Sequence, residues 1–196
     1  MQSSGFVAKS GIEGWKYVYE KIMELRDENQ RHLIILTGLC GSGKSTIAKS
    51  WRKQGFGKIK KKEFFLIDSH VVNLDYILFK KRKKVIVNEG DTIEIFDKYI
   101  PKKVKFVVYI TNAPQKLVKQ ASMIIKLKIP DITRKDFLFE KRYINNQEKA
   151  KLRFAQDTYH LADQILAKHK IELVVSPDDY WKLCKEQDKK GVEAFI

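Results

Sequence analysis

The 196-residue sequence has only two cysteines and no apolar run long enough to cross a membrane. A membrane-spanning helix needs about 20 consecutive apolar residues. Residues 1–5 carry no charged segment followed by an apolar one, which is unlike a secretory signal. Cys40 lies in a glycine-rich stretch that a disulfide would immobilise. We therefore expect Cys40 and Cys184 to be reduced and the protein to be cytoplasmic.

Acidic residues are outnumbered by basic ones. The chain has 24 Asp and Glu against 39 Lys and Arg, which gives a formal charge of +15. Lysine-rich runs occur at 58–62 and 80–84. One interpretation is attraction to an anionic partner such as nucleic acid or a phosphorylated substrate. The other is a set of solvated surface loops, which the lack of interleaved aromatic or glycine residues favours.

No internal repeat, low-complexity tract or linker divides the chain. Hydrophobic residues make up 43% of it and aromatic residues 11%, which suits a globular core. Length and composition together indicate a single domain over 1–196. The four histidines are scattered and give no zinc-ligand spacing with the cysteines.

The most informative stretch is an apolar run at 33–37 followed by the pattern G-x-x-x-x-G-K-[ST] and helix-compatible residues. Glycines let successive backbone N–H groups point at one phosphate, and the helix N-terminus adds a partial positive charge. Lys44 can reach the β- and γ-phosphates, and the Ser45 hydroxyl can join a Mg²⁺ shell. The sequence therefore predicts an NTP-binding P-loop. Its predicted nucleotide-binding residues are Gly38, Leu39, Cys40, Gly41, Ser42, Gly43, Lys44, Ser45 and Thr46.

Other apolar runs predict a sheet, with strands at 33–37, 64–68, 85–90, 104–110 and 171–175. Segments of helical periodicity alternate with them, at 11–30, 44–52, 70–79, 134–168 and 178–189. This alternation indicates an α/β fold in three layers, a five-stranded parallel sheet with helices on both faces. Right-handed crossovers bring the carboxyl ends of all strands to one edge, where ligands bind.

Several features follow one another in a recognisable order. They are the P-loop, a strand ending in Asp68, a strand ending in Glu89-Gly90, a strand followed by a proline turn, a basic segment, and a strand followed by Ser176-Pro177. This order resembles the P-loop kinase superfamily, which includes adenylate, shikimate, gluconate and uridine kinases. The resemblance covers about 33–181 and implies a phosphotransferase that uses ATP and Mg²⁺.

The resemblance also implies roles for two acids. Asp68 is expected to contact the acceptor hydroxyl as a base or orienting group, or to hold a Mg²⁺-bound water. Its alternative role is to cap the next helix. Glu89 resembles the acid that ends the third strand in uridine-kinase-like enzymes, and is expected to bind substrate and metal. Because Asn88 stands where many NTPases keep an aspartate, Glu89, Asp68 and Asp91 are all eligible as the metal-binding acid.

The segment at about 115–170 matches the position of the kinase lid, and 1–32 form a helical extension. A lid excludes water and supplies cations that bridge the γ-phosphate oxygens. Arg142 is the first candidate for this role and Arg153 the second, since they share a face of an unbroken helix. Arg134 is expected to bind substrate. Ser176-Pro177 either borders the adenine base or simply begins the last helix.

The sequence thus predicts a kinase that transfers the γ-phosphoryl group of ATP to a hydroxyl or phosphate of a nucleoside, nucleotide or similar metabolite. A nucleic-acid 5′-hydroxyl end is an alternative acceptor, suggested by the basic charge. A non-catalytic, nucleotide-dependent binding protein is a third possibility, suggested by Asn88 and by the lack of closely paired arginines. The absence of an Asn-Lys-x-Asp motif argues against a Ras-like GTPase.

Overall fold

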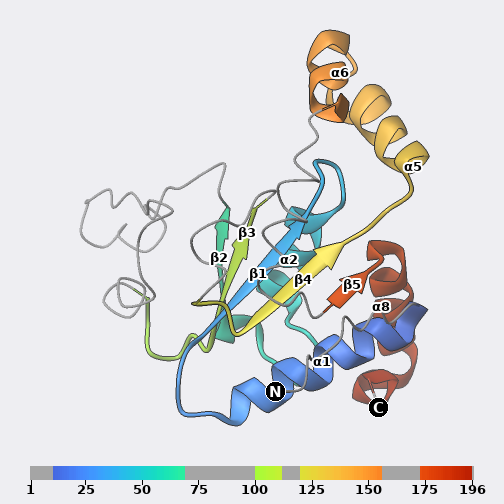
Figure 1. Ribbon diagram of the computed structural model, residues 1–196. Coiled ribbons are helices and arrows are strands. Elements are labelled where there is room, and N and C mark those ends of the chain that lie inside the picture. The colour runs from blue at the N-terminus through green and yellow to red at the C-terminus, as the bar shows by residue number, and fades with distance from the viewer. Residues whose placement is uncertain (1–10, 69–99, 112–119, 156–172, 196) are drawn as a thin grey trace, which may run out of the picture.

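A parallel sheet forms the centre of the fold in the computed structural model, which describes residues 11–68, 100–111, 120–155 and 173–195 (Figure 1). Its five strands lie in the order β2-β3-β1-β4-β5, and every pairing is parallel. They are β1 (His32–Gly38), β2 (Phe64–Asp68), β3 (Phe106–Ile110), β4 (Met123–Leu127) and β5 (Leu173–Val175). The predicted α/β class with a parallel sheet is confirmed.

Strand β4 was not predicted, because 115–170 was assigned as a whole to the lid segment. The apolar run at 123–127 is interrupted by Lys126, which made the stretch look like the start of a basic surface segment. Lys126 is only 6% exposed and lies in register with Thr37 of β1. A lysine can bury its long aliphatic stem in a sheet in this way. The strand predicted at 85–90 lies outside the described residues.

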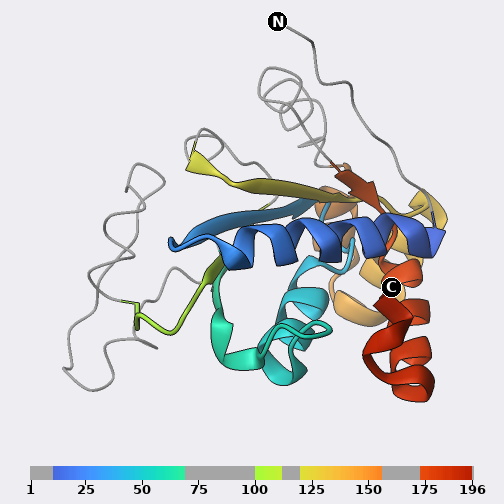
Figure 2. The same ribbon diagram turned by 90° about the horizontal axis from the view of Figure 1, so that it is seen from below.

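Three helices cover one face of the sheet (Figure 2). They are α1 (Gly11–Asp27), α2 (Lys44–Gln54) and α8 (Pro177–Lys190). The predicted helices at 11–30, 44–52 and 178–189 are therefore confirmed, with small differences at their ends. Among the described residues, no helix has both the length and the apolar character that crossing a bilayer requires.

Aromatic side chains from these three helices meet under the sheet. The Trp15 ring lies 6.4 Å from the Trp51 ring and 4.9 Å from the Tyr180 ring, in edge-to-face contacts. Phe56 stacks on Trp51 at 5.3 Å. Edge-to-face and offset contacts of this kind are worth about 0.5–1.5 kcal/mol beyond the buried area. This cluster fixes α1 and α8 against α2 and so holds the P-loop helix in place.

The opposite face of the sheet is buried as well, since Leu33, Ile35, Val107 and Tyr109 have almost no exposed surface. The helix predicted at 70–79 lies outside the described residues. Helices on this second face therefore remain a prediction.

The predicted lid contains α5 (Asp131–Asp136), the π-helix η3 (Phe137–Arg142) and α6 (Gln147–Ala155). These elements stand beyond the carboxyl ends of the strands, above the P-loop (Figure 1). A single helix over 134–168 is wrong in its first half, because the chain turns at 143–146 between η3 and α6. The residues at 156–168 lie outside the described part of the chain. Two short 3₁₀ segments, η1 (Lys61–Glu63) and η4 (Gly191–Phe195), complete the fold.

His32 begins β1 and is almost completely buried. Its Nδ1 atom lies 3.0 Å from the Ser122 hydroxyl. Its Nε2 atom is 3.6 Å from the Glu28 carboxylate, which is too far for a hydrogen bond. Desolvation lowers the pKa of His32 from its usual value of 6.5, and outweighs the opposing attraction of Glu28, while Lys105 adds to the lowering.

A lowered pKa in the folded state makes stability depend on pH. Below pH 6.5 the unfolded chain takes up a proton more readily than the folded chain, so we expect the free energy of unfolding to decrease as the pH falls. The decrease is at most about 1.4 kcal/mol per pH unit for one group. Urea unfolding between pH 7.5 and pH 5.5 measures it. The His32→Gln variant should show a shallower dependence, and an unchanged slope in this variant would contradict the assignment.

Candidate phosphate-binding site

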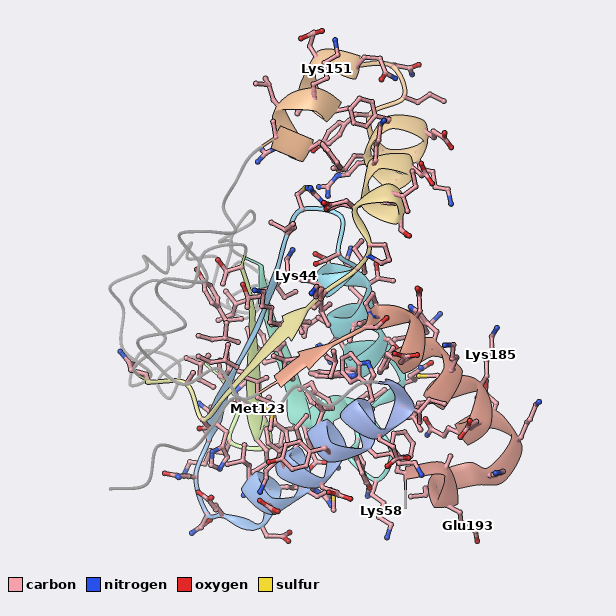
Figure 3. All side chains as sticks on the ribbon, turned by 45° about the vertical axis from the view of Figure 1, so that its right-hand side comes forward. Lys44, Lys58, Met123, Lys151, Lys185 and Glu193 are labelled. Carbon is pink, nitrogen blue, oxygen red and sulfur yellow. The ribbon has the colours of Figure 1, made fainter. Side chains whose placement is uncertain are left out.

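The P-loop joins the carboxyl end of β1 to the first turn of α2, where the sequence predicted it (Figure 3). Gly38, Gly41 and Gly43 have φ values of 138°, 89° and 86°, a backbone region that L-residues with a side chain rarely adopt. A Cβ atom on Gly38 would lie 2.5 Å from the Leu127 carbonyl oxygen and 2.8 Å from Ser42 Oγ. The loop can therefore pass this close to the end of β4 only because Gly38 has no side chain.

Lys44 is held inside the loop. Its side chain is 7% exposed, and its Nζ atom donates hydrogen bonds to Gly38 O and Leu39 O, both at 2.7 Å. Ser42 Oγ lies 3.4 Å from the same nitrogen. The short loop thus surrounds a positive charge that the fold has already positioned, which is the arrangement that a phosphate-binding lysine requires.

The first turn of α2 adds backbone donors beside this charge. The helical ladder begins where the N–H groups of Thr46 and Ile47 donate to Gly43 O at 3.0 Å. N–H groups earlier in the turn have no acceptor within the helix, and the helix dipole makes this end electropositive. Ser45 follows Lys44 in the same turn. The turn can therefore bind an anion and place one hydroxyl next to it.

The lid segment rests on the P-loop. A Cβ atom placed on Gly41 would lie 3.3 Å from Arg134 Cγ and 3.3 Å from Phe137 Cδ1, so α5 and η3 touch the loop at this glycine. At the end of η3, Arg142 Nη1 lies 3.7 Å from Cys40 Sγ. The arrangement brings the Arg142 guanidinium to the tip of the P-loop, although 102 residues separate it from Cys40.

The other two predicted lid cations are placed differently. Arg134 is 5% exposed; its guanidinium donates to Asp131 Oδ1 and to Phe154 O at 3.2–3.4 Å and lies 4.2 Å from the centre of the Phe154 ring. These contacts tie α5 to the end of α6. Arg153 is half-buried in α6. The turn at 143–146 means that Arg142 and Arg153 do not share the face of one unbroken helix.

A cavity of about 450 Å³ lies between the P-loop and the connection from β4 to α5. Its lining combines apolar side chains with a few polar ones; the residues are Leu39, Ser42, Leu127, Lys128, Ile129, Pro130, Asp131 and Arg134. The Lys128 N–H donates to Val175 O at 3.0 Å, so one residue of the cavity lining is bonded to the end of β5. Cavities of this size and mixed lining suit a small ligand.

The predicted acids are only partly placed. Asp68 ends β2, in register with Ile110 of β3, which is itself in register with Leu36 of β1. Asp68 is therefore at the same edge as the P-loop, two strand spacings or about 10 Å from β1. The structure describes the backbone of Asp68 but not its side chain. Glu89 and Asp91 lie outside the described residues.

The strand next to β1 on this side is β3, which ends in Ile110 and is followed by Thr111 rather than by an acid. Thr111 is buried, and its N–H donates to Leu36 O at 3.2 Å. Within the described part of the chain, no group of three or more histidine, cysteine, aspartate or glutamate residues is arranged to hold a metal ion.

Ser176 and Pro177 lie beside the P-loop. A Cβ atom on Gly43 would be 3.4 Å from Pro177 Cβ. Ser176 Oγ accepts a hydrogen bond from the Asp178 N–H at 3.2 Å, which caps α8, and its carbonyl accepts one from Trp15 Nε1. The two residues therefore begin the last helix, and they also form one side of the phosphate-binding loop.

No protein-family model matches the sequence, and no curated protein matches it significantly. Solved structures do match. One is a candidate fructose transport system kinase from Silicibacter sp. TM1040, with 18% identity over 83% of this chain and 98% of the other and a TM-score of 0.47. Another is polyphosphate kinase 2 from Arthrobacter aurescens TC1, with 14% identity over 99% of this chain and 82% of the other and a TM-score of 0.44.

At these identities the two matches identify no substrate and no catalytic residue of this chain. The site is therefore defined by its own geometry.

Sequence reasoning missed two parts of this candidate site. One is the cavity wall formed by the end of β4 and Pro130, which was hidden because β4 itself was not predicted. The other is Phe137, whose ring touches the P-loop at Gly41. The proline and aspartate at 130–131, directly after an apolar run, are a strand-to-helix signal that could have revealed both.

Proposed function

We propose that the protein is a kinase that transfers the γ-phosphoryl group of ATP to a hydroxyl or phosphate of a nucleoside, nucleotide or similar small metabolite. The observation that carries this proposal is the Lys44 ammonium, bound to Gly38 O and Leu39 O inside a loop that only glycines allow. A loop of this kind binds the β- and γ-phosphates of a nucleoside triphosphate. In this proposal a second helical layer covers the far face of the sheet and completes a three-layer fold.

In this proposal, different residues bind the phosphates, the metal ion and the acceptor. Gly38 to Thr46 bind the phosphates, with Lys44 neutralising the charge that develops on them. The Ser45 hydroxyl and one carboxylate, from Asp68, Glu89 or Asp91, would hold Mg²⁺. When bound, this ion supplies charge neutralisation of the transferring phosphate. Asp68 would accept or orient the acceptor hydroxyl at the edge of the sheet.

The nucleoside part of ATP would occupy the 450 Å³ cavity and run toward Ser176 and Pro177. Two observations support this placement. The cavity opens beside the P-loop residues Leu39 and Ser42, and its far wall is bonded to the end of β5. Apolar walls with a few polar groups are typical of sites for an aromatic base. Glu89 and Arg134 would border the acceptor, Arg134 chiefly by fixing α5 and α6.

Two alternatives remain. The acceptor could instead be the 5′-hydroxyl end of a nucleic acid, because the chain carries a charge of +15. The protein could also bind a nucleotide without transferring its phosphate, because the described end of β3 carries no acid. The three readings differ in where the phosphoryl group goes.

Incubating the protein with γ-labelled ATP, Mg²⁺ and a panel of acceptors separates them. The panel contains nucleosides, nucleotides and oligonucleotides with a free 5′-hydroxyl. We expect label on a small metabolite. Label confined to the oligonucleotides would replace the proposal by the nucleic-acid alternative. Tight ATP binding without label on any acceptor would show a non-catalytic protein.

Arg142 provides a test of the lid. Because its guanidinium reaches the tip of the P-loop, Arg142→Ala should lower kcat by about 10³-fold, the effect of losing an arginine that stabilises the transferring phosphate. ATP affinity should change much less, since the charge on the γ-oxygens grows mainly in the transition state. Single-turnover rates and ATP binding measure the two effects.

Arg52→Ala is the matched control, because Arg52 is an exposed arginine on α2. It should leave kcat unchanged. Arg142→Lys should recover only part of the rate, since an ammonium cannot bridge two oxygens as a planar guanidinium does. An Arg142→Ala enzyme with wild-type kcat would remove Arg142 from the mechanism.

A further inference from the structure

Six lysines gather at the edge of the sheet opposite the P-loop. They precede β2 and β3, and we call them the amino-edge lysine cluster: Lys60, Lys61, Lys62, Lys102, Lys103 and Lys105. All are exposed except Lys105, which is half-buried.

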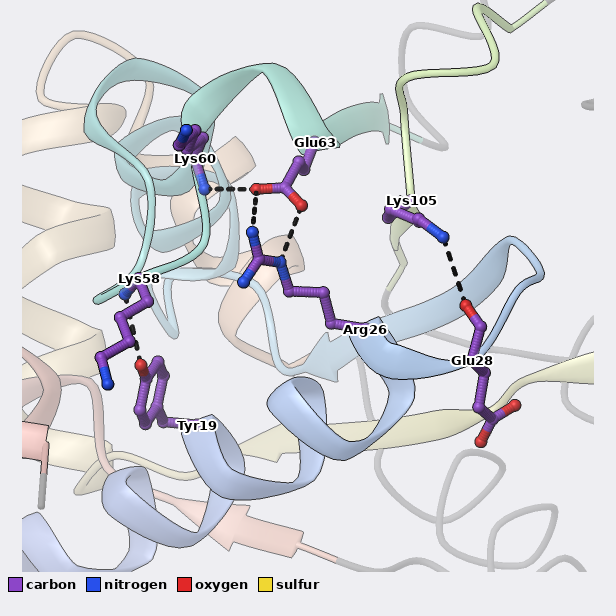
Figure 4. Close-up of polar contacts among 7 residues, drawn as sticks. All are labelled: Tyr19, Arg26, Glu28, Lys58, Lys60, Glu63 and Lys105. Atoms are coloured by element: carbon purple, nitrogen blue, oxygen red, sulfur yellow. Dashed lines mark hydrogen bonds and ion pairs between the residues drawn. The ribbon is translucent and has the colours of Figure 1, made fainter.

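The sheet brings the two halves of this cluster together. Strands β2 and β3 are neighbours, and their first residues, Phe64 and Phe106, are in register. One residue earlier, the Lys105 N–H donates to Glu63 O at 2.9 Å. Lysines about 40 positions apart in the sequence therefore lie on adjacent strands, whose backbones are about 4.8 Å apart. Figure 4 shows Lys60, Glu63 and Lys105 in this region.

The segment carrying Lys102 and Lys103 is held in a fixed turn. The Val104 N–H donates to Pro101 O at 2.9 Å. The Arg31 guanidinium donates to Val104 O, Ile100 O and Pro101 O, each at 3.1 Å. Arg31 thus donates hydrogen bonds to the carbonyl groups of the turn, and the side chains of Lys102 and Lys103 remain at the surface.

Among the described residues, nearby acids neutralise little of this charge. Glu63 is buried, and its carboxylate accepts hydrogen bonds from Arg26 at 2.9 and 3.4 Å and from the Lys60 N–H at 2.7 Å (Figure 4). The Lys105 ammonium donates to Glu28 O, a main-chain oxygen without net charge, at 3.2 Å. The exposed carboxylates at the end of α1 are those of Asp27 and Glu28. Positive charge therefore dominates the part of this edge that the structure describes.

We propose that the amino-edge lysine cluster binds nucleic acid through its phosphates, at a surface separate from the phosphoryl-transfer site. Strand β1 has seven residues between the two edges, which is a distance of about 20 Å at 3.3 Å per residue. A phosphate bound at this surface is therefore too far from the P-loop to be the phosphoryl acceptor itself. The proposal is independent of whether the P-loop transfers phosphate.

The surface chemistry favours nucleic acid over a membrane. Membrane-binding surfaces usually add apolar side chains that enter the lipid. In the described part of the chain, the large exposed hydrophobic residues all lie in the lid segment: Ile132, Phe137, Ile144 and Leu152. The cluster also contains no aromatic residue that could stack on a base. Binding should therefore involve the phosphate backbone, with little dependence on base sequence.

The test measures binding of the full chain to short DNA and RNA duplexes whose 5′ ends already carry phosphate, so that neither offers a 5′-hydroxyl acceptor. Fluorescence anisotropy between about 50 and 200 mM salt gives the affinity and its salt dependence. The variant is Lys61→Gln/Lys62→Gln/Lys103→Gln. Its matched control is Lys185→Gln/Lys189→Gln/Lys190→Gln, which removes the same charge from three exposed lysines of α8.

We expect the cluster variant to lose about tenfold or more in affinity at low salt and to reduce the salt slope by about two to three units. The control variant should lose much less, and Lys44→Ala should bind both duplexes as tightly as the wild-type chain. Equal losses of affinity in the cluster and control variants would show that binding depends only on the net charge of the chain, and would overturn the proposal. So would failure of the wild-type chain to bind either duplex, or binding only to vesicles containing phosphatidylserine.

Discussion

Replacing Lys44 with alanine is expected to lower the rate of phosphoryl transfer by about 10²–10³-fold and to weaken ATP binding as well. The ammonium is already positioned, because it bonds to Gly38 O and Leu39 O inside the loop. The rate is measured in single-turnover transfer from labelled ATP, and affinity with a nucleotide analogue.

The same substitution leaves two loop carbonyls without their charged donor, which costs about 1–3 kcal/mol of stability. Urea unfolding must therefore accompany the kinetics, although a loss of this size leaves an ordinary domain folded. Lys53→Ala is the matched control, because Lys53 is an exposed lysine on the same helix. A Lys44→Ala protein that transfers phosphate at the wild-type rate would refute the role of Lys44.

The second large effect is expected from Gly38→Ala. The new Cβ atom would lie 2.5 Å from the Leu127 carbonyl oxygen, a backbone atom that cannot move without disturbing the pairing of β1 with β4. The φ of 138° adds strain of its own. We expect a loss of at least about 3 kcal/mol in the free energy of unfolding, together with loss of nucleotide binding.

Gly191→Ala separates the two contributions. Gly191 has a φ of 65°, but nothing lies within 4 Å of the position of its Cβ. The Gly191→Ala variant should therefore lose only the part of the free energy of unfolding that comes from backbone strain, about 1–2 kcal/mol. If Gly38→Ala is no more destabilising than Gly191→Ala in urea unfolding, the close approach of β4 to the P-loop is not a real constraint.

The P-loop could be predicted because its chemistry is local. Eight consecutive residues carry the glycines, the lysine and the hydroxyl, and the strand and helix on either side follow from residues next to them. Helix α1 was predicted for the same reason, since Trp15, Val18, Tyr19 and Ile22 lie on one helical face and are all buried. Patterns that repeat within one element need no knowledge of the rest of the chain.

The internal structure of the predicted lid segment and the order of the strands could not be predicted in this way. Lys126 made β4 look like a surface segment, and only its neighbours β1 and β5 bury it. The pairing of β3 with β1 puts Thr111, rather than an acid, beside the P-loop strand. The contact of Arg142 with Cys40 depends on where η3 ends relative to the loop, which no spacing in the sequence specifies.

By itself the sequence predicted the glycine-rich P-loop and the parallel α/β class, and it determined the excess of positive charge. The tertiary structure decided which groups meet. It placed Arg142 above the P-loop and six lysines at the opposite edge of the sheet. It also engaged Arg134 in an ion pair with Asp131 and a hydrogen bond to Phe154 O. The physical reason is that glycine geometry and helical periodicity act over a few residues, whereas strand pairing and helix packing join residues that are tens of positions apart.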